Sequence, residues 1–272
     1  MKSNLFESGP DGIVRTVLAE AQGPTYVVAP DESLVEAVVE TTMEFEDEPP
    51  EVRMLADGTI LRRVMEDFIV ASSAADLVAD GTLEMRTQDG LSENPTVVTG
   101  DVVMAVVSAG GDVAGLTTVD DDFVGTAVDS YDEAWTAAEE FDLRTPPLSS
   151  VRETLASDVG ADTEEDFSDV LSSLETARSG GDGLDEVTIS LLVGAKNEQL
   201  FYDISRWGED VGVASKATFS RTKNELEESG IIDTEKVPVD VGRPRQRLTI
   251  EDERLEEADS CQIASIAESI LN

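Results

Sequence analysis

The chain has 272 residues, of which 59 are acidic and 19 basic, so its formal net charge is −40 at pH 7, and it contains no histidine and one cysteine. Without histidine there is no imidazole acid–base chemistry and no histidine metal ligand, and Cys261 alone cannot form a zinc site or an internal disulfide. No apolar run approaches the ~20 residues of a membrane span and no signal-peptide pattern follows Met1, so we expect a cytoplasmic protein without catalytic residues, metal or cofactor, and no membrane partner.

Residues 1–143 alternate apolar runs with amphipathic segments. Helices are predicted over 13–18, 32–43, from Gly58 to about Ala79, and over 122–141. Strands are predicted over 25–29, 52–56, 83–87, 96–98, 102–108 and 114–119. The early strands alternate with helices and favour parallel pairing, whereas the later hairpins add antiparallel strands. We therefore predict an α/β sensor or dimerisation domain with a mixed sheet flanked by helices.

Three arginines surround the predicted start of the long helix in this domain. Arg62 and Arg63 lie in its first turn behind Gly58 and Thr59, and Arg53 lies on the preceding strand. A helix N-terminus attracts phosphate or carboxylate, and arginine adds bidentate pairing. The pattern fits a phosphorylated sugar as effector, while pairing with the abundant carboxylates is the alternative. The segment lacks a P-loop and a GxGxxG motif, which leaves a phosphate-handling enzyme at these arginines as the weakest interpretation.

Residues 144–184 are predicted to connect two modules. Thr145-Pro146-Pro147 is followed by a helix over 149–159 and by another that begins at Thr163, and residues 179–183 form a glycine-rich linker.

Residues 185–250 have the order of a winged helix-turn-helix. A helix over 185–196 is followed by one over 200–211 that ends at Gly212, and Ser215 is placed to cap a further helix that stops at Gly230. Residues 231–241 and 247–250 are predicted to pair as a wing across a loop with Gly-Arg-Pro-Arg.

The capped helix and the wing carry the residues expected to contact DNA. The major groove is assigned to short polar and cationic side chains on the outer face: Ser215, Thr218, Ser220, Arg221 and Asn224. Phosphates or the minor groove are assigned to cations on the helix and wing: Lys216, Lys223, Arg243, Arg245 and Arg247. Winged helices also bind proteins, so an interaction adaptor without direct DNA contact is the alternative function.

The last segment, 251–272, is predicted to be one helix with an apolar seam of Leu255, Ala258, Ile263, Ile266 and Ile270. The seam needs a partner, which is either the winged core or a second chain. A homodimer contact here and one through the connector helices stay open, since regulators commonly read two half-sites as dimers.

The few basic residues are concentrated in the predicted winged helix. Residues 1–184 hold 40 acidic and 9 basic side chains, whereas 214–249 hold 6 and 7. A nearly neutral segment in a strongly anionic chain favours DNA over the adaptor and the enzyme.

The segment ASKATFSRTKNELEESGIIDTEKVPVDVGRPRQRL, behind an acidic α/β domain, resembles the haloarchaeal TrmB-shared promoter-binding (TbsP-like) regulators. The resemblance implies a halophilic, homodimeric transcription factor that binds promoters of sugar metabolism, with its DNA-binding helix at 215–229 and its wing at 239–247. The first domain is also similar to the phospholipase-D-like sensor fold of TrmB-type proteins, but without the histidine of that enzyme motif, so hydrolysis is not implied.

Overall fold

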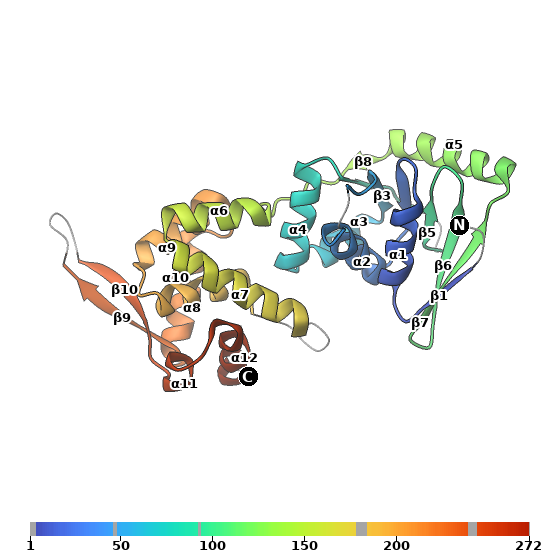
Figure 1. Cartoon of the computed structure of the whole chain (residues 1–272). Helices are drawn as coiled ribbons and strands as arrows, with labels where there is room; N and C mark the ends of the chain where they lie inside the picture. The colour runs from blue at the N-terminus through green and yellow to red at the C-terminus, as the bar shows by residue number, and fades with distance from the viewer. Residues whose placement is uncertain (1–3, 46–47, 92–93, 178–183, 239–243, 272) are drawn as a thin grey trace. The chain divides into compact units, whose positions relative to one another are not determined.

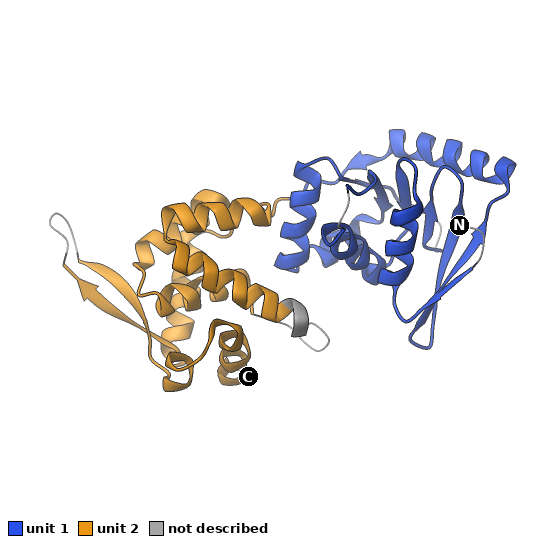
Figure 2. Cartoon of the chain, in the orientation of Figure 1, with its two compact units in different colours: residues 1–143 blue, residues 144–272 orange. Residues whose placement is uncertain are grey.

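The computed structural model describes the chain except for residues 1–3, 46–47, 92–93, 178–183, 239–243 and 272 (Figure 1). The chain divides into two compact units, Met1–Leu143 and Arg144–Asn272 (Figure 2). Within the described ranges, no helix is both long and apolar enough to cross a membrane.

The first unit is built on a mixed sheet of eight strands in its described part. The strands are β1 (Leu5–Glu7), β2 (Thr25–Val28), β3 (Val52–Ala56), β4 (Leu83–Thr87), β5 (Thr96–Val98), β6 (Val103–Ala109), β7 (Asp112–Thr118) and β8 (Glu139–Glu140). Their order is β1-β7-β6-β5-β2-β3-β4-β8. The β2–β3 and β3–β4 pairs are parallel and the others antiparallel, which confirms the predicted mixed α/β sheet.

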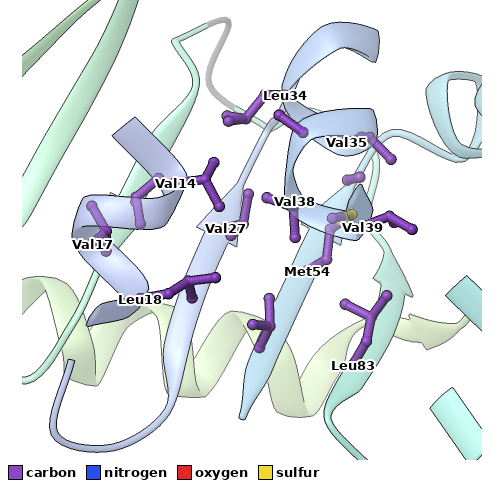
Figure 3. Packing of buried hydrophobic residues seen from close by; sticks show 14 of the residues in the cluster. Val14, Val17, Leu18, Val27, Leu34, Val35, Val38, Val39, Met54 and Leu83 are labelled. Carbon is purple, nitrogen blue, oxygen red and sulfur yellow. The ribbon is translucent and has the colours of Figure 1, made fainter. Parts of the chain in front are cut away.

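Helices cover both faces of this sheet. They are α1 (Pro10–Glu20), α2 (Glu32–Met43), α3 (Gly58–Val64), α4 (Phe68–Ala79) and α5 (Asp121–Ala137). Alternation along the strands sorts side chains between two cores, so Val27 and Met54 pack with α1 and α2, as Figure 3 shows. Tyr26 and Leu55 instead point to the opposite face and pack with Trp135 of α5.

Two predicted helices of this unit end earlier than expected. The long helix over 58–79 is broken, because the Asp67 side chain accepts hydrogen bonds from Ile69 N (2.8 Å) and Val70 N (3.2 Å) and so starts α4 anew. The closing helix stops at Ala137, and the residues after it form β8 against β4. The two-residue β8 and the three-residue β1 were not predicted, because Glu139–Glu140 and Leu5–Glu7 lack the β-branched residues that mark the equally short β5.

The second unit contains the predicted winged helix. Its elements are α8 (Glu186–Lys196), α9 (Phe201–Val211), α10 (Lys216–Glu228), β9 (Ile232–Val237) and β10 (Arg245–Ile250). Strands β9 and β10 pair antiparallel from Arg245–Val237 to Ile250–Ile232. An antiparallel bridge between Leu200 and Arg247 joins the start of α9 to the wing. The order helix, bridge, helix, helix and hairpin is that of a winged helix-turn-helix.

The remaining helices of this unit pack around that core. They are α6 (Leu148–Asp158), α7 (Ala161–Ala177), α11 (Glu253–Glu256) and α12 (Ser260–Leu271). The last helix was predicted as one piece but is two, and Ile263, Ala264 and Ala267 of α12 are buried, with α12 packed mainly against α7. Asp166 of α7 joins them, since it accepts hydrogen bonds from Ser260 of α12 and from Lys196 Nζ at 2.9 Å.

Candidate nucleic-acid interface

The turn between α9 and α10 depends on two glycines. Gly212 adopts a left-handed conformation with φ of 93°, and Val213 N donates to Gly208 O at 2.8 Å, which closes the end of α9. A Cβ at Gly208 would overlap the ring of buried Phe219, so this glycine lets the two helices approach. The sequence pattern indicated Gly212, whereas the role of Gly208 depends on a contact that spacing does not reveal.

Ser215 caps α10 as predicted. Its Oγ accepts a hydrogen bond from Thr218 N at 3.2 Å and lies 3.0 Å from Thr218 Oγ1. Both hydroxyls, assigned to the major groove from sequence, therefore already define the first turn of the helix.

The exposed face of α10 presents Arg221 and Asn224 near its middle. The Arg221 side chain is 72% exposed, and its Nε lies 3.9 Å from Glu225 Oε1. Ala217, which the sequence interpretation passed over, is exposed on the same helical stripe, whereas Thr218 and Ser220 are half-buried.

Lys223 does not lie on this face. Its side chain is only 7% exposed, its Nζ pairs with Glu227 Oε2 at 2.7 Å, and it lies 5.7 Å from the centre of the Phe201 ring. The sequence analysis predicted a phosphate contact for Lys223 from its positive charge alone. Its position on α10 instead turns the side chain toward the interior. Glu227 continues the network, since its Oε1 accepts from Thr234 Oγ1 at 2.9 Å, and so links α10 to the wing.

Arg245 and Arg247 of β10 lie beside carboxylates of α9 and of the segment between α8 and α9. Arg245 Nη1 lies 3.3 Å from Asp203 Oδ1, and its guanidinium lies 4.5 Å from the centre of the Tyr202 ring. Arg247 Nη1 lies 3.6 Å from Glu198 Oε2. Arg243 lies outside the described residues.

Lys216 also has a carboxylate beside it. Its Nζ donates a hydrogen bond to Glu209, which lowers the pKa of that carboxyl and raises the pKa of the lysine. Both groups are therefore charged at neutral pH. Lys216, Arg221, Arg245 and Arg247 thus form a cationic set in which each member has a carboxylate neighbour.

The anion site predicted in the first unit does not assemble. The expected long helix is the seven-residue α3, and the carboxylate of Asp57 already accepts a hydrogen bond from Thr59 N at 2.6 Å at its N-terminus. Arg62 is exposed beside Gly58, its Nη1 within 3.1 Å of where a Cβ would stand, and Arg63 pairs with Glu32 of α2.

Arg53 belongs to a different cluster on the α5 side of the sheet. It donates to Tyr26 Oη at 2.8 Å and to Glu51 Oε1 at 2.6 Å, and it lies 6.0 Å from the Trp135 ring centre. Burial raises the pKa of Tyr26, and its hydrogen bond to Asp132 raises it further. These contacts tie β2 and β3 to α5 and leave Arg53 apart from Arg62 and Arg63. No group of metal-ligating side chains occurs in the part of the chain that the structure describes.

A tight turn leads into α10, which exposes one polar face, and a hairpin that carries arginines follows it. This arrangement defines a winged helix-turn-helix of the kind found in DNA-binding regulators. The chain belongs to the family of TbsP-like transcriptional regulators. The family's N-terminal domain matches residues 2–146, and its C-terminal helix-turn-helix domain matches residues 147–268. The protein is therefore a DNA-binding transcriptional regulator.

Solved structures show weaker likenesses. The archaeal chromatin protein TrmBL2, whose structure is described as showing a novel mode of DNA binding, is 17% identical with a TM-score of 0.36, over 52% of this chain and 54% of that one. This chain thus spans about half the length of that protein. NucT from Helicobacter pylori is 10% identical with a TM-score of 0.37, over 51% of this chain and 98% of that one. No curated protein matches the sequence. Likenesses this low do not establish the phospholipase-D-like sensor fold.

Proposed function

We propose that the protein binds promoter DNA as a homodimer, with α10 in the major groove of each half-site and the wing against the flanking backbone. The exposed stripe of α10 carries the proposal, because Arg221 and Asn224 stand there on a helix whose other face is fixed to the winged core. Two copies would read two half-sites about one helical turn apart.

The individual roles follow from side-chain chemistry. Arginine pairs with the acceptors of guanine, and asparagine pairs with adenine, so Arg221 and Asn224 are assigned to base edges. Lys216, Arg245 and Arg247 are assigned to phosphates, which position the protein without reading sequence. Ser215 and Thr218 act through the cap, which fixes where the first turn of α10 points.

Arg221→Ala tests these roles against Arg254→Ala, a matched change of an exposed arginine on α11 that is also paired with a carboxylate. Operator fragments are titrated with each variant in molar potassium chloride. Because a bidentate base contact is lost, Arg221→Ala is expected to bind the operator with a binding free energy weaker by about 1–3 kcal/mol. Arg254→Ala is expected to bind like the wild type. Equal affinities of all three proteins would remove Arg221 from the base-reading role.

We further propose that the target promoters belong to sugar-metabolism genes, on the resemblance of the recognition segment to TrmB-shared regulators. A genome-wide binding map in cells tests this, with the Arg221→Ala variant as the control. Peaks that disappear in the variant and lie at sugar-metabolism genes support the proposal, whereas peaks at other genes reassign the pathway. A folded protein without any peaks supports the protein-interaction adaptor. A phosphorylated-sugar effector is not placed at Arg53, Arg62 and Arg63, because these residues do not converge.

A further inference from the structure

One end of the sheet in the first unit carries an uncovered apolar surface. Its large side chains are Phe6 of β1, 74% exposed, and Val107 of β6 and Leu116 of β7, each 45% exposed. The strand register places them side by side, since Phe6 lies opposite Ala114, Ala114 lies opposite Val107, and Leu116 lies opposite Ala105. Directly opposed side chains are about 5 Å apart, so these residues form one continuous surface, which we call the β1–β7–β6 face.

The β1–β7–β6 face lies on the same side of the sheet as α5, but its large side chains remain exposed. Val113 and Val106 point to the other side and are buried in the main core. On the α5 side, helix packing centres on Trp135 and Tyr26, further along the sheet. Figure 1 shows β1, β6 and β7 at the end of the sheet away from β8 and α4. Exposed apolar patches of this kind mark interaction sites.

The same end of the sheet has an open strand edge. Strand β1 is terminal in the strand order, so one edge of Leu5–Glu7 pairs with β7 and the other has no neighbouring strand among the described residues. An open edge presents unpaired backbone N–H and C=O groups with which another strand can pair. Two identical edges related by a two-fold axis pair antiparallel and use the same surface on both copies.

The apolar faces of the C-terminal and connector helices are largely covered within the chain. Ile263 and Ala267 of α12 are buried, with α12 packed mainly against α7, and Val151 and Leu155 of α6 are buried as well. In the described part of the C-terminal and connector helices, Leu271 (44%) is the exposed large apolar side chain, whereas the β1–β7–β6 face presents three.

We propose that a second copy of this chain docks on the β1–β7–β6 face, with β1 paired to its counterpart and Phe6 next to the two-fold axis. The inference rests on the proposed function as a homodimer, and it identifies the surface through which the two copies associate. Charge distinguishes a second copy from a basic partner protein through the direction of the salt dependence. Exposed Asp112 lies on β7, and exposed Asp121 and Asp122 follow that strand at the start of α5, so two acidic copies repel at low ionic strength and associate more tightly as salt screens that repulsion. A basic partner would bind less tightly as salt rises.

The mass of the full chain in solution tests the proposal, measured by sedimentation without DNA from 0.1 to 3 M potassium chloride. The wild type is expected to dimerise more tightly as salt rises. Phe6→Asp with Leu116→Asp should weaken the dimer by about 100-fold or more, because carboxylates then replace central apolar anchors. The matched control, Val78→Asp, changes an exposed apolar residue of α4 and should remain dimeric. A monomeric wild type, or a double variant with unchanged dimerisation, overturns the proposal.

A second variant avoids dependence on folding of the double aspartate protein. Phe6→Cys in a Cys261→Ser background keeps a small apolar residue on β1 and should form an intermolecular disulfide under oxidising conditions, whereas Val78→Cys should not. Absence of a link at position 6 in a dimeric protein places the interface elsewhere and overturns the proposal. DNA titrations of the same proteins separate the two questions, because a stable dimer without operator binding contradicts the proposed function and leaves the interface standing.

Discussion

Asp166 joins three helices of the second unit through one carboxylate. Lys196 Nζ donates to it at 2.9 Å and Asn197 Nδ2 at 2.6 Å, and Ser260 completes the set. Asp166→Ala removes the acceptor and leaves a partly buried ammonium without a counter-charge, so we expect a loss of about 2–4 kcal/mol in the free energy of unfolding. Denaturant unfolding measures this loss, with the exposed Asp169→Ala on the same helix as control; equal losses in both variants would contradict the role of the network.

The pH dependence of the same residue follows from its surroundings. Burial alone would raise the pKa of Asp166, but hydrogen bonds from Ser260, Lys196 and Asn197 outweigh burial and lower it. The stabilisation is therefore fully present above the ordinary aspartate pKa of about 3.9 and is lost as pH falls through the lower folded-state value. The difference in free energy of unfolding between wild type and Asp166→Asn should narrow below about pH 4. A difference that stays constant from pH 7 to pH 3 would show that the charge of Asp166 is not responsible.

Lys223 is expected to act on the structure of the winged helix rather than on DNA. Its pair with Glu227 leads through Thr234 to Gln246 of β10, whose Nε2 donates to Thr234 Oγ1 at 3.2 Å. Lys223→Met should lower the melting temperature while keeping the salt dependence of DNA binding, because no phosphate contact is lost. A phosphate contact would instead reduce the slope of log K against log salt by about 1, which is the outcome that would restore its sequence-based role.

At the level of elements, the break between α3 and α4 depends on Asp67. Asp67→Ala removes the acceptor for Ile69 N and Val70 N and should cost about 1 kcal/mol of stability in the first unit. Asp67→Ser restores a capping oxygen and should recover most of that loss. Thermal unfolding of the three proteins decides the matter, and a serine variant as unstable as the alanine variant would assign the effect to another contact of Asp67.

The same break shows where sequence reasoning succeeds and stops. Helix α2 and strand β3 have their predicted limits. The Asp31 side chain caps α2, and residues 52–56 are apolar except for Arg53 and end at the turn residues Asp57 and Gly58. Asp67 is equally good as a cap, but it lies inside a continuous apolar pattern that a single long helix also explains. The order of the strands in the sheet is harder to predict from sequence, since β1 pairs with β7 across more than a hundred residues and no local pattern indicates that pairing.

In the candidate site, too, features that depend on local sequence were predicted and features that depend on distant contacts were not. The Ser215 cap and the glycine end of α9 are local and were predicted, whereas the inward direction of Lys223 depends on Phe201 and Glu227 lying beneath it. The separation of Arg53 from Arg62 also depends on packing, since Arg53 joins the cluster on the α5 side of the sheet, whereas Arg62 lies on helix α3.

At the scale of the whole molecule, a regulator with a net charge of −40 must bind a polyanion. Ordinary DNA-binding proteins lose affinity with salt, with a slope of roughly −0.9 in log K per phosphate contact. Here the cationic set has carboxylates beside it, at Glu198, Asp203, Glu209 and Glu225, and DNA brings phosphates close to these as well. Salt cations are then taken up between the carboxylates and the phosphates when the complex forms. This uptake offsets the release of the counterions that the cationic side chains displace from DNA.

We therefore expect operator binding to depend on salt much less steeply than the three phosphate contacts assigned to each subunit require. Converting these four carboxylates to Gln or Asn should steepen the slope and strengthen binding at low salt. The control neutralises four exposed acids of the first unit, Glu84, Asp89, Asp129 and Glu133, and changes the net charge equally. Fluorescence titrations from 0.2 to 3 M potassium chloride separate the two cases. If both quadruple variants shift binding alike, the total charge governs affinity; if only the first does, the carboxylates next to the cationic set are what make DNA binding tolerant of salt.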